Sequence, residues 1–234
     1  MYILALETST RSPNIALARD NQVIKTGRLE PHQSTAGDLI PAIESLLSAT
    51  DLVPADIELV AVSVGPGSFT GLRVGLTIAK TWCHITGAAL VAVDVFEILA
   101  GQVPPTPVLS PVIPAQRGQV FAALFEWNSG DENYRAIEAE SWWSPEEWLS
   151  RVPPETVFTG PGTRLMEQAY SGELSRSDPR TWEPQAETVA RLGWKKHSAG
   201  QRDDPKTVVP RYLRPSAAEE KRMRARREIE SRKD

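Results

Sequence analysis

Residues 58–86 join an apolar run to a glycine-rich turn and then to a helical pattern. The run ELVAVSV (58–64) is apolar almost throughout, which is typical of a strand covered on both faces of a sheet. The turn GPGSFTG (65–71) and a helix over 70–86 follow directly, and Gly87 can end that helix. A strand, a glycine turn and a helix in this order predict an α/β layer architecture.

The segments on either side of this unit extend the same architecture. The Asp20-Asn21 pair predicts a tight hairpin between two of the early strands. Apolar residues at helical spacing predict a helix over 34–49, in which Pro41 should cause a kink or mark the first turn. The predicted elements are strands 2–6, 14–19, 22–28 and 89–94, and helices 34–49 and 95–102.

The segment VPPTPVLSP (103–111) is the clearest change of composition in the chain, because it holds four prolines in nine residues. We place a domain boundary there, which gives an N-terminal lobe over 1–104, a smaller α/β lobe over 105–210 and a basic tail over 211–234. In the second lobe we predict strands at 119–127 and 156–159, the latter running into a second Gly-Pro-Gly turn. A helix start is predicted at Ser144, whose capping box includes Glu147, and a later helix at 186–197.

The net charge of −4 is unevenly distributed along the 234 residues. Residues 1–104 and 105–210 each carry a net charge of −4, whereas residues 211–234 carry +4. An acidic body argues against a large nucleic-acid groove on this chain. The polar residues 216–232 predict a solvated helix of mixed charge, and a basic arm that contacts RNA or an acidic partner is the alternative.

The single cysteine, Cys83, rules out a disulfide framework and a Cys-based zinc site and favours a reducing compartment. The start MYILALETST has no basic region of the kind that opens a signal peptide, and no apolar run approaches the ~18 residues that span a bilayer. We therefore expect a cytoplasmic protein with no membrane partner.

The glycine loop resembles phosphate-binding motifs without matching either of the two common ones. A P-loop has four residues between its glycines and a lysine after the second, but here five residues separate Gly65 from Gly71 and a leucine follows. The dinucleotide fingerprint fits more closely, and an acid at the end of the next strand, Asp94, would suit a ribose, but Pro66 removes an N–H donor. The loop is thus a candidate nucleotide site or a structural turn, through Gly65, Gly67, Ser68, Thr70 and Gly71.

Few residues suggest catalysis or metal binding. The three histidines, His32, His84 and His197, have no metal-ligand spacing, and no G-x-S-x-G nucleophile motif occurs. Residues 7–10 (ETST) end the first strand with an acid and three hydroxyls, which form either a polar turn or a phosphate contact. We expect no catalytic residue, no metal and no cofactor.

The helices at 34–49 and 70–86 carry broad apolar faces that either cover the sheet or are partly left over for a partner subunit. The candidate partner-interface residues are Leu39, Ile43, Leu46, Leu47, Leu72, Arg73, Leu76 and Lys80. If they form such an interface, Leu76→Asp should abolish partner binding while leaving the monomer folded.

Several segments resemble the bacterial TsaB (YeaZ) family. The segment VAVSVGPGSFTGLRVGLTIAKTW carries the family's G-P-G-S-F-T-G loop. The segments ILALETST, PHQSTAGDLIPAI and VVPRYLRPSAAE resemble the family's start, its H-S-x-x-L-[LI]-P segment and its P-x-Y-L-R-x-x-x-A end. The resemblance spans the chain and is weakest in the middle.

The resemblance implies the two-lobed actin-like ATPase fold of sugar kinases and Hsp70, in which each lobe has a mixed sheet and helices. It further implies a catalytically inactive subunit that dimerises with a TsaD-type catalytic subunit through N-lobe helices. That complex, which a TsaE-type ATPase joins, makes N6-threonylcarbamoyladenosine at position 37 of tRNAs that read ANN codons. The chain would then reach tRNA through the complex and could form a homodimer alone. An ATP- or dinucleotide-dependent enzyme that uses Gly65–Gly71 is the alternative function, and a peptidase role is disfavoured by the missing motifs.

Two positions depart from the family pattern. Glu7 stands where the family usually has Asp, which weakens a role in holding a nucleotide-bound metal. The family's D-A-R motif at the start of the second lobe is replaced here by Pro114-Ala115-Gln116-Arg117.

Overall fold

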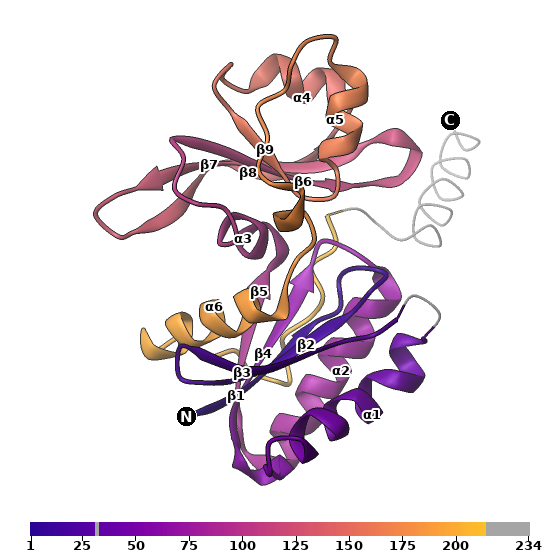
Figure 1. The fold of residues 1–234 in the computed structure, drawn as a ribbon, viewed down its shortest axis with the longest axis vertical. Helices are drawn as coiled ribbons and strands as arrows, with labels where there is room; N and C mark the ends of the chain where they lie inside the picture. Colours follow the sequence, from indigo (N-terminus) through magenta and orange to yellow (C-terminus); the bar gives the residue numbers. More distant parts are fainter. Residues whose placement is uncertain (31–32, 214–234) are drawn as a thin grey trace, which may run out of the picture.

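The computed structural model describes residues 1–30 and 33–213 as two mixed β-sheets with helices between and outside them (Figure 1). The expectations for His32 and for the tail at 216–234 lie outside the described residues. The strands are β1 (Tyr2–Glu7), β2 (Asn14–Arg19), β3 (Gln22–Arg28), β4 (Ile57–Gly65), β5 (Ala89–Asp94), β6 (Val108–Pro114), β7 (Val120–Asn128), β8 (Asn133–Trp143) and β9 (Val157–Thr159). The α-helices are α1 (Thr35–Ser48), α2 (Phe69–Thr86), α3 (Val95–Ala100), α4 (Pro145–Arg151), α5 (Thr163–Ala169) and α6 (Ala186–Ser198).

The first sheet has the strand order β3-β2-β1-β4-β5. The strands β1, β2 and β3 pair in antiparallel fashion, and β4 and β5 run parallel to β1. Each of these strands and the helices α1, α2 and α3 form where the sequence predicts them, with bounds that differ by a few residues at most. Gly87 ends α2 in the left-handed conformation (φ 79°), as predicted. Pro41 lies inside α1, beyond its first turn.

Both faces of the first sheet are covered. On one face, α1 and α2 pack leucines such as Leu39 and Leu76 against the strand residues Leu4 and Val60. On the other face, α3 and α6 pack against a second set of strand residues that includes Ala61. Because β1 and β4 are buried on both sides, their sequences are apolar almost without interruption.

The second sheet has the order β8-β7-β6-β9, with β9 parallel to β6 and the other pairs antiparallel. The helices α4 and α5 cover its outer face through buried residues such as Trp148 and Met166. The capping box at the start of α4, formed by Ser144 and Glu147, is present as predicted. The strand β8 was not predicted, because it has charged residues in its middle and depends on its long pairing with β7.

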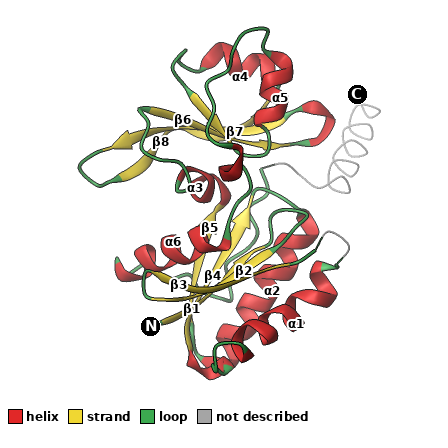
Figure 2. Cartoon of the chain, in the orientation of Figure 1, coloured by secondary structure: helices red, strands yellow, loops and turns green. Residues whose placement is uncertain are grey.

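The helices α3 and α6 form a layer between the two sheets (Figure 2). The chain thus builds the second sheet and then returns to the first, because α6 contacts β1, β2, β4 and β5. The division into 1–104 and 105–210 stays a prediction, and both α6 and residues 203–210 of the second range pack on the first lobe. The two-lobed α/β architecture itself is confirmed.

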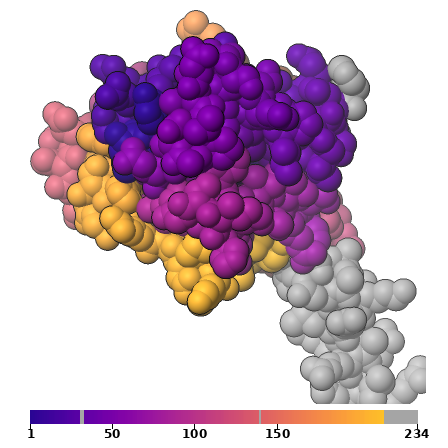
Figure 3. Space-filling model, turned by 90° about the horizontal axis from the view of Figure 1, so that it is seen from below, coloured from indigo at the N-terminus to yellow at the C-terminus, as the bar shows by residue number. Residues whose placement is uncertain are grey.

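Beyond α6, residues 203–213 form a segment without helix or strand, which has a turn at 205–207 and which we call the strap. It starts beside β5, where the N–H of Asp203 donates to the carbonyl of Leu90 at 2.9 Å. It ends at the carboxyl end of β4, where the N–H of Arg211 donates to the carbonyl of Val64 at 2.7 Å. From below, the yellow residues of α6 and the strap border the purple face that α1 and α2 help to form (Figure 3).

Candidate functional site

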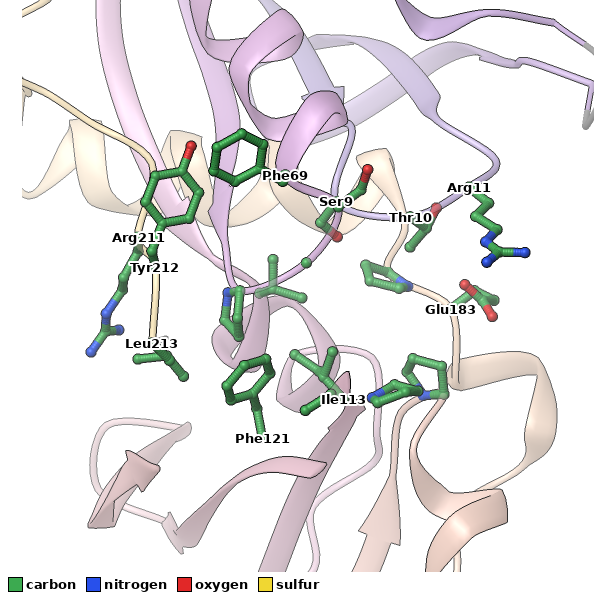
Figure 4. A pocket seen from close by; sticks show the side chains of 18 of the residues that line it. Ser9, Thr10, Arg11, Phe69, Ile113, Phe121, Glu183, Arg211, Tyr212 and Leu213 are labelled. Carbon is green, nitrogen blue, oxygen red and sulfur yellow. The ribbon is translucent and has the colours of Figure 1, made fainter. Parts of the chain in front are cut away.

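A cleft of about 800 Å³ lies between the two lobes. Its walls come from the turn after β1, the glycine loop, the second sheet and the end of the strap (Figure 4). Ile113 and Phe121 rise from the second sheet toward the glycine loop, while Arg11 and Glu183 lie at one end of the cleft and Arg211 at the other. The cleft therefore combines an apolar centre with charged ends.

The glycine loop connects β4 to α2, and one of its side chains, that of Ser68, caps the helix. Ser68 is the N-cap, and its hydroxyl accepts a hydrogen bond from the N–H of Gly71 at 3.2 Å. Gly65 has a φ of 115°, which favours glycine. The cap satisfies one of the helix N-terminal donors that such loops otherwise present to an anion.

The turn after β1 lies directly against this loop. The N–H of Ser68 donates a 2.6 Å hydrogen bond to the carbonyl of Ser9. A Cβ atom at Gly67 would overlap the same carbonyl, and a Cβ atom at Gly71 would overlap the carbonyl of Thr8. Glycine is required at these two positions because the chain's own backbone approaches them closely. Of the two interpretations of the loop, the contacts favour the structural one.

Glu7 at the end of β1 is fully buried. Its Oε1 accepts hydrogen bonds from the N–H of Ser9 at 2.6 Å and from the Ser9 hydroxyl at 2.5 Å. Burial raises the pKa of Glu7, and the hydrogen bonds from Ser9 offset part of this effect. Glu7 is not one of the described residues that line the cleft. Its carboxylate is used to shape the turn after β1.

The segment that replaces the D-A-R motif lies in the opposite wall of the cleft. Pro114, Ala115 and Gln116 line it, and Arg117 follows in the left-handed conformation (φ 60°). This wall of the cleft therefore presents a proline ring, a methyl group and an amide, and it lacks the acidic side chain that begins the family's D-A-R motif.

The predicted partner-interface residues fall into two groups. Six apolar residues are buried in this chain's own core, at most 4% exposed, where they cover the first sheet. They are Leu39, Ile43, Leu46, Leu47, Leu72 and Leu76. Since the apolar face of each helix is used by the sheet, these side chains are not available to a partner, and this choice of residues is corrected. The interface itself stays a prediction about the two helices.

Arg73 and Lys80, the other two predicted interface residues, hold the strap. The Arg73 guanidinium lies 3.8 Å above the centre of the Phe69 ring, and its Nε donates to the Tyr212 hydroxyl at 2.9 Å. The rings of Phe69 and Tyr212 stack at 5.0 Å (Figure 4). Lys80 donates to the carbonyl of Val208 at 3.0 Å. Sequence reasoning missed these contacts, although the strap includes part of the VVPRYLRPSAAE segment that carries the family resemblance.

The outer faces of α1 and α2 carry exposed side chains that are not among the predicted interface residues. Ile40 on α1 is 59% exposed and Ile85 on α2 is 76% exposed. Thr77 and Thr81 share the exposed face of α2 with Ile85, because they lie at four-residue spacing. The sequence signal that could have identified this surface is an apolar residue outside the buried face of each helix, Ile40 on α1 and Ile85 on α2.

Within residues 1–30 and 33–213, no group of three or more His, Cys, Asp or Glu side chains is placed to hold a metal ion. No helix in these ranges is both long and apolar enough to cross a membrane.

The chain is similar to known proteins along most of its length. Residues 31–221 match the sequence model of a family described as TsaD, tRNA N6-adenosine threonylcarbamoyltransferase. The tRNA threonylcarbamoyladenosine biosynthesis protein TsaB of Bacillus subtilis is 32% identical over 94% of this chain and 97% of its own. The TsaB of Escherichia coli is 27% identical over 93% of this chain and 96% of its own.

Two solved structures from Pseudomonas aeruginosa share the fold. One, described as an uncharacterized protein with similarity to the peptidase YEAZ, has a TM-score of 0.76 at 22% identity and covers 91% of this chain and 99% of its own. The second, YeaZ, has a TM-score of 0.74 at 21% identity and covers 90% of this chain and all of its own. The chain thus shares the two-lobed α/β fold of the YeaZ structures.

Proposed function

Because the chain belongs to the TsaB (YeaZ) family of tRNA threonylcarbamoyladenosine biosynthesis proteins, we propose that it is the non-catalytic partner of a TsaD-type transferase. The pair forms N6-threonylcarbamoyladenosine at position 37 of tRNAs that read ANN codons. In this proposal a TsaE-type ATPase joins the complex, tRNA is reached through the complex, and the protein works in the cytoplasm.

The contact between the turn after β1 and the glycine loop is the observation that carries the non-catalytic role. The loop has the position of a phosphate-binding loop, but the N–H of Ser68 is bonded to Ser9 and the N–H of Gly71 to the Ser68 hydroxyl. Glu7, the acid nearest to the loop on β1, is buried and bonded to Ser9. The loop thus fixes the start of α2, and this supports a role in assembly rather than in chemistry. The nucleotide-dependent alternative gains no support from these contacts.

The partner surface in this proposal is the outer face of α1 and α2. Ile40 and Ile85 are apolar and well exposed, and they lie on helices whose inner faces are anchored in the core. A surface built on rigid helices changes little on binding, which favours a specific interface. When the transferase is absent, the same surface would support a homodimer.

Binding to the purified TsaD-type protein of the same organism tests the proposal. We expect Ile40→Asp and Ile85→Asp each to weaken the complex at least tenfold in calorimetry, because a carboxylate would be placed in an apolar contact. The reconstituted reaction, followed as threonylcarbamoyladenosine in digested tRNA, should lose activity in parallel.

Ile137→Asp is the matched control, because Ile137 is 49% exposed and lies on β8 of the other lobe. This variant should bind as the wild type does. Unchanged affinity for both helix variants would overturn the proposed surface, and threonylcarbamoyl transfer by the isolated chain would overturn the non-catalytic role.

A further inference from the structure

The strap is fixed to the first lobe along most of its length. At its start, the Asp203 carboxylate accepts from the N–H of Ala92 at 2.8 Å. In its middle, Val208 packs into the core beneath α2 and its carbonyl accepts from Lys80. Near its end, Tyr212 stacks on Phe69. The strap is therefore anchored to both β5 and α2.

Arg211 sits where the strap reaches the carboxyl end of the first sheet. Its N–H donates to the carbonyl of Val64 at 2.7 Å. Its own carbonyl lies 2.7 Å from the place where a Cβ atom of Gly65 would stand. These backbone contacts fix the position of Arg211 independently of its side chain.

The Arg211 guanidinium joins two carboxylates that belong to different lobes. Its Nη1 bonds Asp94 Oδ2 at 2.6 Å, and its Nη2 forms an ion pair with Glu140 Oε1. Asp94 ends β5 in the first sheet, and Glu140 lies on β8 in the second. The two carboxylate side chains are only 14% and 13% exposed. One cation thus bridges two nearly buried anions across the lobe boundary.

Asp94 also lies where the chain leaves the first sheet. Its Oδ1 accepts from the N–H of Phe96 at 2.7 Å and caps α3, the helix between the two sheets. Burial raises the pKa of Asp94, and Arg211 offsets part of that effect. Without the guanidinium, two carboxylates that are only 14% and 13% exposed would repel each other without a cation between them. Movement of the second lobe away from the first would relieve this repulsion.

We propose that Arg211 is an interlobe latch, through which the strap holds the second lobe in place over the cleft. The strap carries the guanidinium, α2 holds the strap through Arg73 and Lys80, and Glu140 is the receiving group on the second lobe. A change at the outer side of α2 that moves the strap would therefore also change the width of the cleft. The latch is a property of the chain itself and does not depend on the proposed partner.

The distance between spin labels on the two lobes tests the latch. Cysteines introduced at the exposed positions Ser45 on α1 and Glu146 on α4 would carry the labels, with Cys83 replaced by serine. We expect Arg211→Gln to shift the distance distribution to longer values and to broaden it, while circular dichroism stays that of a folded chain. Hydrogen exchange at the Arg211 amide should show whether the strap itself has been released.

A second substitution separates the latch from a general loss of structure. Adding Glu140→Gln to Arg211→Gln removes one of the two repelling anions, so the distribution should return part of the way toward the wild type. Arg202→Gln, at an exposed arginine just before the strap, should leave the distribution unchanged. An unchanged distribution in the folded Arg211→Gln variant, or no recovery in the double variant, would overturn the proposal.

Discussion

The backbone N–H of Ser68 donates a 2.6 Å hydrogen bond to the carbonyl oxygen of Ser9, and this bond joins the turn after β1 to the loop that starts α2. One glycine before Ser68 and one after it allow the turn to lie this close to the loop, since a Cβ atom at Gly67 or Gly71 would overlap the turn. The turn after β1 therefore packs directly against the loop at Gly67 and Gly71. The direction of α2, and of the surface it carries, follows from that contact.

Gly71→Ala should lower the free energy of unfolding by at least about 2 kcal/mol, because the added methyl group would overlap the carbonyl of Thr8. Gly37→Ala is the control. Gly37 also lies near a helix start, but a Cβ atom there would find its nearest neighbour at 3.9 Å, so we expect stabilisation of about 0.4–1 kcal/mol. Urea unfolding of both variants checks the prediction, and equal effects would contradict it.

Leu76→Asp should unfold the protein instead of leaving a folded monomer that fails to bind. Leu76 is 3% exposed in the core beneath α2, so an unpaired carboxylate there should cost more than about 4 kcal/mol. Ile85→Asp on the same helix is exposed and should change stability by less than about 1 kcal/mol. Thermal unfolding distinguishes the two, and a cooperative transition near the wild-type temperature for Leu76→Asp would contradict this expectation.

Glu7→Gln should change how stability depends on pH. Burial raises the pKa of Glu7 in the folded chain above its usual value of 4.5. The folded chain then binds the proton more tightly than the unfolded chain does, so the stability that Glu7 contributes is complete below pH 4.5 and is lost as the pH rises through the folded pKa. Glutamine keeps the Oε1 acceptor for Ser9 and does not ionise.

The stability of Glu7→Gln relative to the wild type should therefore increase from pH 4 to pH 8. Urea unfolding at both pH values measures the difference. A difference that is the same at pH 4 and pH 8 would count against a raised pKa.

Ser110→Ala should destabilise the second lobe by about 1–3 kcal/mol. The Trp148 indole N–H donates to the Ser110 hydroxyl at 2.8 Å, and both side chains are fully buried, so the substitution leaves a buried donor without an acceptor. Ser45→Ala, at an exposed position on α1, should change stability by less than about 0.5 kcal/mol. Chemical unfolding followed by tryptophan fluorescence tests this pair of variants.

A fragment of residues 1–104 should not fold cooperatively. It contains the whole first sheet but lacks α6, which covers one face of that sheet so closely that a Cβ atom at Gly193 would overlap Ala61. Exposing this apolar face removes the burial that stabilises the lobe. Circular dichroism and thermal unfolding of the fragment are the measurements, and a sharp transition would contradict the role given to α6.

Many elements of both lobes could be predicted from the sequence because their signals are local. The apolar run at 58–64, the N-cap Ser144 and the helix-ending Gly87 each identify an element from a few neighbouring residues. The strand β8 was missed, because its residues carry no clear alternation and its pairing with β7 is what holds it in a sheet.

The candidate site was predicted less well. The glycine loop was identified, and its structural interpretation agrees with its contacts. The apolar faces of the two helices were also identified, but their leucines were assigned to a partner, whereas they are buried in the chain's own core. A periodic pattern indicates that Leu39 or Leu76 needs an apolar neighbour, and it does not indicate whether that neighbour is the chain's own sheet or another protein. In the structure, both leucines pack against the chain's own first sheet.

The sequence by itself determined the class of fold, the places of most strands and helices, and the family, because these depend on short-range patterns and on long shared motifs. Only the tertiary structure decided that α6 returns to the first sheet, that Arg73 and Lys80 hold the strap, and that Arg211 bridges Asp94 and Glu140. Each of these contacts joins residues far apart in the chain. Their geometry is fixed by the packing of the two sheets around the helices between them, and no local pattern encodes that packing.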